Sequence, residues 1–594
     1  MFFHIIGSKR LSTFGQAEAG TYLCRIGAMA RPALAGLVLA ACPAFAQQSP
    51  TPPPVPSTLD PNRIRENIEP LPELPRAPPP LSGPASEQQA PEAAAAARFV
   101  WRSIRIEGAQ ALPLDRLMAE WDHAPGAEVS VEDVFRFANA ITRLYAREGY
   151  LLSFAVVPQQ RIEAGDVTIR VVEGFVEAIR FTGDPLPGGP GGPVAALADR
   201  ITRARPLTNA DFERYLLLIN DIPGVRVAAT VSASPGTPGG SVVTLNISRD
   251  KAAAEVGYNS YLPSSLDTHV IGGSLNLYGT VAARDRIRID GWKSALGDAH
   301  WSLGGEYATF IGTDGLAVSL SGFYSNTDPV APLLELLDYQ GKAVNVRLAA
   351  RYPLIRSRVR NLDVEFAASL ANSESDILDV AEMRDRLRTV SLGVSYSFSS
   401  GDQSSTAIRL GTEHGLRVLD ARGNSRANGV PDYMVLTMEA QRLQPIGRAL
   451  GGQMSLLMAA QAQYASRGPL LSAAECSLGG RRFGRRFDSG EVTGDHCLLG
   501  SMELRWSLPV RLGGDAPGGL QLYGFLDGGT LRQKGALLAG ERRQRGAMSA
   551  GGGVRIETSR YISGSFEVSR ALTAPTGSPL ERSVRAMGSV WLRF

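Results

Sequence analysis

Apolar and polar residues alternate along the C-terminal part of the chain. From Ala254 to the end, about 16 such segments follow one another, separated by turn or loop sequence. In DRIRIDGW, for example, Ile287 and Ile289 point to one side of the strand and Arg288 to the other. The segments are about 9–13 residues long, enough to cross a bilayer at a tilt, whereas a soluble sandwich usually has shorter strands. The pattern predicts an all-β membrane domain, a 16-stranded transmembrane β-barrel over 251–594.

The links between the segments alternate in length. Counted from Ala254, the even-to-odd links are short, as in TVAARD, FIGTD and SSGDQ, and several odd-to-even links are long, above all 467–498. Short turns on one side and long loops on the other are typical of outer-membrane barrels. A water-filled lumen also explains why the polar face of many segments is charged. The last segment ends on an aromatic residue, Phe594, which shares a face with Val590 and Leu592.

Two units with the same order of elements precede the barrel. The first, 98–174, begins with the strand FVWRSIRIEG and continues with two helices and two strands. The second, 175–250, repeats this order from FVEAIRFTG to GSVVTLNISRD. Each unit has about 75 residues, so the pattern is an internal structural repeat of two α+β domains.

The N-terminus carries an export signal. An apolar stretch is followed by Ala44-Phe45-Ala46, which fits removal of a signal peptide over 1–46. A rival interpretation makes LAAC a lipobox that would lipidate Cys42; in both cases the protein leaves the cytoplasm. Residues 47–97 are rich in Pro and Ala and predict a linker. Within it, 60–67 could form a short helix, although a plain linker explains the composition equally simply.

Composition and charge exclude several classes of function. The net charge of +3 over 594 residues gives no global attraction to nucleic acid. No His or Cys grouping has the spacing of a metal site, and no Ser/His/Asp or paired-carboxylate set has a convincing register. We therefore expect no metal, no cofactor and no enzyme. Removal of the signal leaves two cysteines, Cys476 and Cys497, which in an oxidising compartment predict a disulfide across the longest loop.

That loop contains GGRRFGRRFDSG at 479–490, four arginines and two phenylalanines on a glycine-rich backbone. A nucleic-acid patch would need an RNA- or DNA-binding fold around it, and none is predicted. A phosphate-binding loop would need a following lysine of the Walker type. A solvated surface loop and a loop held inside the barrel both remain open on the residues alone.

Two α+β units, a 16-strand barrel and a long sixth loop resemble the two-partner-secretion transporters (the TpsB family, ShlB/FhaC/HecB-type haemolysin secretion/activation proteins), a branch of the Omp85 superfamily. The resemblance implies that the two units are POTRA domains and that an arginine at the tip of the loop pairs with an aspartate on the barrel wall. The tip motif then corresponds to Gly484, Arg485, Arg486 and Phe487, and the wall motif to Phe525, Asp527 and Gly529. Arg486 stands where the family has glycine. RRF occurs twice, so we expect Arg485 as the partner of Asp527, with Arg482 as the alternative.

The resemblance also implies a function. The protein would lie in the outer membrane, among its lipids and lipopolysaccharide, with the POTRA domains in the periplasm, and would secrete an unfolded client protein. The client could add to the strand 226–234 beside a helix groove formed by Phe212, Leu216 and Leu217, although these residues suit the domain's own core equally well. The helix near 60–67 would plug the pore, and Phe594 would be read by the barrel-assembly machinery. Two alternatives are an Omp85-type insertase and a passive porin.

Overall fold

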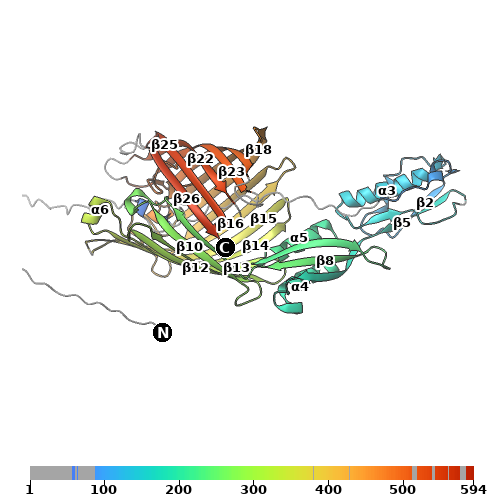
Figure 1. Cartoon of the computed structure of the whole chain (residues 1–594), viewed down its shortest axis with the longest axis horizontal. Coiled ribbons are helices and arrows are strands. Elements are labelled where there is room, and N and C mark those ends of the chain that lie inside the picture. Colours follow the sequence, from blue (N-terminus) through green and yellow to red (C-terminus); the bar gives the residue numbers. More distant parts are fainter. Residues whose placement is uncertain are drawn as a thin grey trace, which may run out of the picture. The chain divides into compact units, whose positions relative to one another are not determined.

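The computed structural model describes residues 57–59, 63–64, 87–162, 164–378, 380–426, 428–510, 518–537, 542–558, 561–574 and 584–594. These residues belong to one compact unit and form two small α+β domains and a closed barrel (Figure 1). The expected signal peptide over 1–46, most of the linker and most of the segment 60–67 lie outside the described residues.

The first domain packs its helices against a three-stranded sheet. Its elements are β1 (Arg98–Val100), β2 (Ser103–Glu107), α2 (Leu114–Met118), β3 (Glu128–Ser130), α3 (Val131–Arg147), β4 (Phe154–Val156) and β5 (Asp166–Val172). The sheet order is β2-β5-β4, and β1 pairs with β3 separately. Helix α3 begins where Ser130 and Asp133 form a capping box. Its apolar face, which includes Phe137 and Ile141, is buried in the domain core.

The second domain repeats this plan. It contains β6 (Phe175–Gly183), α4 (Pro193–Arg203), α5 (Asn209–Asn220), β7 (Val225–Ala233) and β8 (Gly240–Arg249). The sheet order is β6-β8-β7, with β6 parallel to β8 and β7 antiparallel to it. Strand β7 is therefore an edge strand within the described sheet. Among the described residues, no helix has the length and hydropathy that crossing a membrane requires.

Sixteen strands close into a barrel, which confirms the predicted fold class. The strands are β9 (Ala252–Asn259), β10 (Val270–Tyr278), β11 (Asp285–Ser294), β12 (His300–Ile311), β13 (Leu316–Thr327), β14 (Gln340–Arg356), β15 (Arg360–Ile377), β16 (Val380–Ser399), β17 (Ser405–Gly415), β18 (Met434–Ala449), β19 (Gly452–Arg467), β22 (His496–Val510), β23 (Gly518–Arg532), β24 (Gln544–Glu557), β25 (Ile562–Thr573) and β26 (Val584–Arg593). Neighbours pair antiparallel, and the last strand closes the barrel by pairing with the first, as in Ser589 opposite Asn259.

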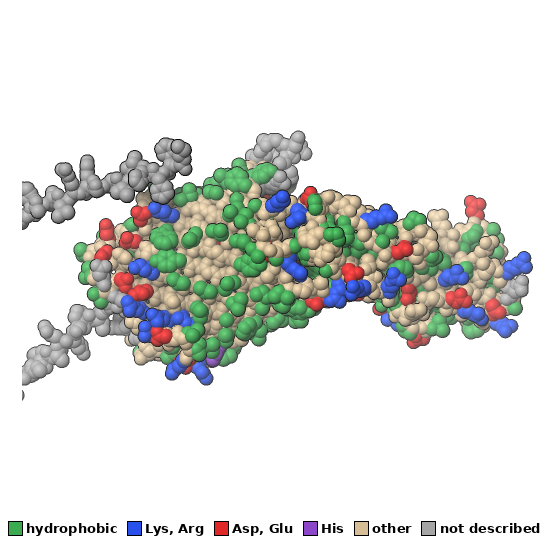
Figure 2. All heavy atoms as spheres, turned by 90° about the horizontal axis from the view of Figure 1, so that it is seen from below, with side chains coloured by type: hydrophobic (Ala, Val, Ile, Leu, Met, Phe, Trp, Pro, Cys, Tyr) green, Lys and Arg blue, Asp and Glu red, His purple; other side chains and the backbone are tan. Residues whose placement is uncertain are grey.

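The wall has two chemically different faces. In β23, Leu522 and Leu526 point outward and are exposed, whereas Tyr523, Phe525 and Asp527 are buried on the lumen side. Figure 2 shows hydrophobic side chains gathered over the barrel wall. This is the alternation expected of strands that face lipid on one side and a polar lumen on the other.

Counted from the first barrel strand, the links follow the predicted alternation with two exceptions. The link between β11 and β12 connects an odd strand to an even one, and its five residues, 295–299, are no longer than a short turn. The link between β15 and β16 connects an odd strand to an even one, yet it has only two residues, 378–379. These two strands are the longest of the barrel, with 18 and 20 residues, so segments that would otherwise form a loop continue as paired strands. Between β19 and β22, residues 468–495 form the longest link, and we call this segment the sixth loop.

The second domain contacts the short turns of the barrel. Arg356 at the end of β14 donates two hydrogen bonds to Asp221, of 2.8 and 2.6 Å. Arg214 on α5 donates to the carbonyl oxygen of Pro353 at 3.1 Å, and Arg200 on α4 donates to Thr313 at 3.0 Å. The short turns therefore lie on the side of the second domain, and the sixth loop starts at the opposite end of the barrel.

Candidate functional site: the sixth loop inside the barrel

The sixth loop is an ordered hairpin. Its strands β20 (Cys476–Leu478) and β21 (Val492–Gly494) pair antiparallel. A disulfide joins Cys476 to Cys497, the second residue of β22, with a Cα–Cα distance of 6.2 Å. The loop is therefore tied at its base to the barrel wall, and the segment 479–490 forms its tip.

The tip is held by backbone hydrogen bonds and an apolar core. The amide of Gly480 donates to the carbonyl of Phe487 at 2.9 Å, and the amide of Phe487 donates to the carbonyl of Gly484 at 2.8 Å. Phe483 and Phe487 are buried in one cluster with Leu478 and Val492 of the hairpin. Gly484 has φ +79°, and a Cβ there would lie 2.7 Å from the Leu478 side chain, so this position requires glycine.

Arg485 leaves the tip and meets three carboxylates of the barrel wall. Its Nη1 donates to Glu503 on β22 at 2.8 Å and to Glu567 on β25 at 3.0 Å. Its Nε lies 3.2 Å from Oδ2 of Asp527 on β23, an ion pair, and its backbone amide donates to the same oxygen at 3.4 Å. The arginine side chain is 8% exposed. We call this group the Arg485 anchor.

The electrostatics of the anchor keep the arginine charged. Burial lowers the pKa of the Arg485 guanidinium, and the charges of Glu567, Glu503 and Asp527 raise it by more, so the pKa lies above its ordinary value. Glu503 also pairs with Arg555 at 2.6 Å and Arg505 at 2.7 Å. Three arginines thus face three carboxylates, which is the balance that a buried ionic group needs.

The predicted wall motif, Phe525, Asp527 and Gly529, lies on β23 and contributes Asp527 to the anchor. The Arg485 guanidinium carbon lies 3.9 Å from the centre of the Phe525 ring, a cation–π contact. Asp527 also accepts a hydrogen bond from Ser549 on β24. A Cβ at Gly529 would lie 2.4 Å from the Leu498 carbonyl oxygen, so a glycine there lets β23 approach β22 closely. The structure thus brings Phe525, Asp527 and Gly529 to one patch of wall.

The neighbours of Arg485 have separate partners. Arg482, the alternative register, reaches Glu439 on β18 at 3.2 Å and not Asp527. Asp488 pairs with Arg585 on β26 at 2.7 Å and accepts a hydrogen bond from the Ser264 hydroxyl at 3.0 Å. Arg486 is buried. The positive φ angles of the tip fall on Gly479, Gly480, Gly484 and Gly490 and not on Arg486, so an arginine in place of the family's glycine causes no backbone strain.

A short piece of the N-terminal segment lies inside the barrel. Leu59 and Ile64 are buried in a cluster with Trp292 and Trp591 of the wall. Arg63 donates to the backbone carbonyls of Ser472 and Glu475 at the base of the sixth loop, the second at 3.1 Å. Residues 63–64 are helical; the remainder of the predicted helix lies outside the described residues.

The predicted client groove on the second domain needs correction. Phe212 and Leu216 are 9% and 5% exposed and belong to the hydrophobic core between the helices and the sheet. They are buried because α5 turns this apolar face toward its own sheet, so they offer no surface to another chain. Leu217 is half-buried. The side chain of Phe594 is exposed, and its backbone pairs with Ala254 at the barrel closure.

Sequence reasoning missed two members of the anchor, Glu503 and Glu567. Both are acidic residues on the lumen-facing parity of their strands, as Asp527 is. A search of the strands near the sixth loop for lumen-facing carboxylates would have selected them.

Comparisons with known proteins agree with this architecture. Residues 99–174 match the model of the POTRA domain, ShlB-type. The solved structure of CdiB from Escherichia coli aligns with a TM-score of 0.70 at 20% identity, covering 86% of this chain and 94% of that one. CdiB from Acinetobacter baumannii aligns with a TM-score of 0.62 at 15% identity, covering 87% and 93%. The chain is therefore an outer-membrane β-barrel protein with an N-terminal POTRA region.

The family model that describes the haemolysin secretion/activation protein ShlB/FhaC/HecB matches residues 239–556, more than half of the chain. The chain belongs to this family.

Curated relatives match over shorter stretches. The heme/hemopexin transporter protein HuxB of Haemophilus influenzae is 34% identical over 109 residues, 18% of this chain and 19% of the relative. The outer membrane transporter CdiB of Escherichia coli is 27% identical over 222 residues, 36% of each protein. The matched stretches thus span about a fifth and about a third of these relatives.

Proposed function

We propose that this protein captures an unfolded client protein in the periplasm and secretes it through its barrel to the cell surface or medium. The observation that carries the proposal is the sixth loop, which lies in the lumen and is fixed to the wall by Arg485 and three carboxylates. A passive porin has no need of a buried ionic anchor or of POTRA domains. Family membership supports transport of an exported protein.

Capture would use the exposed edge of the second domain. Strand β7 has no strand partner on its outer edge in the described sheet. The backbone of Val227 on this edge bonds to the Asn220 side chain, and an extended client segment can add to the rest of the edge through backbone hydrogen bonds. Because backbone pairing reads no particular side chain, it suits a long client of varied sequence. Leu217 is the member of the predicted groove that stays partly accessible.

The Arg485 anchor would fix the position of the loop during transport. Removing one partner from a buried ion pair costs about 3–5 kcal/mol, because the other charge stays buried without compensation. An anchor of this strength holds the loop in one place while other parts of the lumen change their conformation during transport. Nothing in the anchor performs bond-making chemistry, so we assign no catalytic activity to it.

The proposed function also implies how the protein reaches the outer membrane and what it contacts there. Export of the precursor would require the signal peptide over 1–46, and insertion would involve the barrel-assembly machinery at the C-terminal strand that ends in Phe594. The exposed apolar belt, which includes Leu522 and Leu526, would contact outer-membrane lipid and lipopolysaccharide.

Deletion of the gene followed by proteomics of the medium and the cell surface tests the proposal. Selective loss of one exported protein, restored by the wild-type gene, is expected. A general loss of outer-membrane barrels would instead support an insertase, and unchanged export with altered uptake of small solutes would support a porin.

A further inference from the structure

The sixth loop is attached unequally to the two sides of the lumen. Toward β22, β23, β25 and β26 it makes the Arg485 anchor and the pair of Asp488 with Arg585, whose charged side chains are at most 14% exposed. Toward β18 it makes the pair of Arg482 with Glu439, whose side chains are 46% and 39% exposed. Exposed pairs contribute little to stability because water and salt screen them. The tip of the loop is therefore held firmly on one wall and weakly on the other. The base of the loop is also held on the β18 side, where Leu470 and Leu471 are buried against Tyr433 and Val435 and where Arg426 pairs with Glu475 and Asp495.

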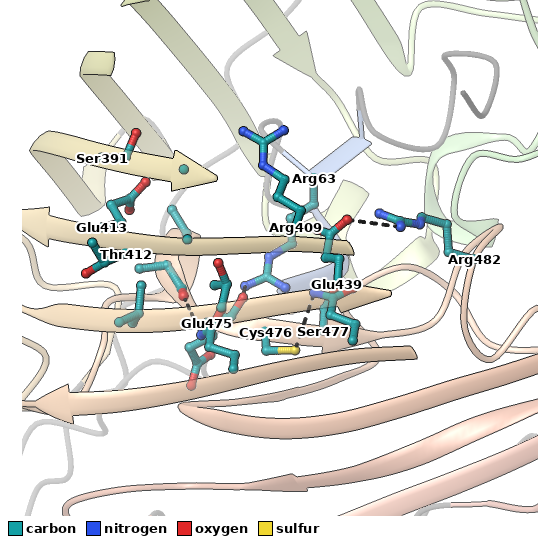
Figure 3. A pocket seen from close by; sticks show the side chains of 18 of the residues that line it. Arg63, Ser391, Arg409, Thr412, Glu413, Glu439, Glu475, Cys476, Ser477 and Arg482 are labelled. Atoms are coloured by element: carbon teal, nitrogen blue, oxygen red, sulfur yellow. Dashed lines mark hydrogen bonds and ion pairs between the residues drawn. The ribbon is translucent and has the colours of Figure 1, made fainter. Parts of the chain in front are cut away.

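A cavity of about 680 Å³ lies on the weakly held side. Its wall residues come from strands β14 to β19, and its other side is formed by the loop and by Arg63 (Figure 3). We call it the lateral cavity.

The lining of the lateral cavity is polar and carries both charge signs. Glu365 pairs with Arg347 at 2.9 Å and with Arg409 at 3.0 Å, so the charges of the wall are largely matched to one another. Glu413 and Thr437 add further polar groups. Such a wall offers hydrogen bonds to a peptide backbone without selecting one charge.

Contacts at the tip and at the base of the loop limit the cavity. The exposed pair of Arg482 with Glu439 crosses from the loop tip to β18 (Figure 3). At the end where β19 leaves the membrane, Arg63 binds the carbonyls of Ser472 and Glu475. Gln463 on β19 also donates to the Ala474 carbonyl at 3.1 Å. None of these contacts belongs to the Arg485 anchor, so they can open while the anchor stays closed.

We infer that the client passes through the lateral cavity, between the sixth loop and strands β16 to β19, as an extended polar polypeptide, while the Arg485 anchor remains intact. The inference rests on the proposed function and adds the side of the loop on which transport takes place and the contact that must open. At the loop tip, the Arg482–Glu439 pair is that contact.

The contacts around the cavity make it a partial path that must widen. The Arg482–Glu439 pair lies beside it at the loop tip, and Arg63 with the base of the loop borders it. Crossing the apolar part of a membrane takes about nine extended residues. The resting cavity is therefore a section of the path, and separation of the loop tip from β18 would extend it.

Linking experiments in cells distinguish the two sides. In one variant Arg482→Cys and Glu439→Cys are joined by a short bismaleimide, which fastens the loop to β18. In the matched variant Ser264→Cys and Asp488→Cys are joined by the same reagent, which fastens the tip to the outer loop beside β9. Cys476 and Cys497 form a disulfide and do not react, and Cys24 and Cys42 lie in the expected signal peptide over 1–46. A mass shift verifies each link, and each linked variant is compared with its unlinked form.

The readout is export of the protein that gene deletion removes from the medium. We expect the 482–439 link to abolish export and the 264–488 link to leave it at the unlinked level. Export that survives the first link, or that is stopped by the second, overturns the inference. Both results leave the proposed function standing, because that function fails only when gene deletion removes no exported protein.

Single-channel conductance gives a second test that needs no client and is unaffected if a linked variant assembles poorly. Ser391→Cys on β16 places a thiol in the lateral cavity, and Ser563→Cys places one on the lumen side of β25, both at half-buried serines. After attachment of a bulky maleimide to the purified full-length protein, we expect reduced conductance for the first and little change for the second. Equal reduction, or reduction at Ser563 alone, contradicts the inference.

Discussion

The Nε of Arg485 lies 3.2 Å from Oδ2 of Asp527, and the backbone amide of the same arginine points at the same oxygen from 3.4 Å. The Asp527 carboxylate thus contacts both the side chain and the backbone amide of Arg485. This contact fixes the orientation of the tip as well as its position. Glu503 and Glu567 hold the far end of the guanidinium.

Arg485→Ala should release the loop tip without unfolding the barrel. It leaves three carboxylates facing two arginines in a buried site, which costs about 3–5 kcal/mol in local stability. Cleavage of the tip by added protease should become faster, while the heat-dependent shift of the folded barrel on gels stays unchanged. Arg485→Lys should be intermediate, because one ammonium group cannot reproduce the guanidinium's forked contacts. Protease resistance equal to the wild type would show that the anchor does not hold the tip.

Cys476→Ser should loosen the base of the loop. The disulfide closes a segment with a sequence separation of 21 residues, for which a stabilisation of about 3 kcal/mol is typical. We expect a lower Tm for the purified barrel in detergent, and the same decrease for Cys497→Ser and for the double variant. Additive decreases from the two single variants would argue against a shared bond.

Asp221→Ala should weaken the contact between the second domain and the barrel. Asp221 accepts two hydrogen bonds from Arg356. Removing the Asp221 carboxylate leaves the Arg356 side chain partly buried without this partner. The distance distribution between spin labels on the domain and on the barrel should broaden. Asp199→Ala is the matched control, since Asp199 pairs with Arg203 on the exposed face of one helix, where such pairs are worth about 0.3–0.5 kcal/mol. Equal distributions for Asp221→Ala and the wild type would contradict this role.

Ile64→Ala should weaken the seating of the N-terminal segment. Ile64 is 1% exposed in a cluster with Trp292 and Trp591, and truncating such a side chain costs about 2–5 kcal/mol. Because the segment also borders the lateral cavity through Arg63, we expect more frequent channel openings in planar bilayers. An unchanged opening frequency would mean that this segment does not restrict the pore.

The barrel could be predicted from sequence because its signal repeats. Alternation with a period of two residues recurs in every strand, and each segment supports the same conclusion. The pairing of Arg485 with Asp527 was predicted from a family resemblance rather than from the pattern. Glu503 and Glu567 were missed because alternation gives the face of a residue but not its height along the wall, which depends on strand register.

The apolar face of α5 is a case in which the sequence pattern fits two structures equally well. Phe212 and Leu216 have the spacing of a binding groove and equally that of a helix packed on its own sheet. Only the position of the sheet separates the two, and here the sheet covers both residues. The edge of β7 follows from its place in the sheet, because it has one strand partner there. Asn220 at the end of α5 covers part of this edge at Val227, and binding of a client to the edge stays a prediction.

The most direct test of the account is export by a deletion strain that carries one of three genes: wild type, Arg485→Ala or Arg482→Ala. The amount of the client in the medium is compared at equal amounts of folded barrel. We predict that Arg485→Ala exports little, because the loop loses its fixed position, whereas Arg482→Ala exports at least as much as the wild type, because it loses only the exposed contact to β18. Wild-type export by Arg485→Ala would contradict the claim that transport depends on an anchored loop.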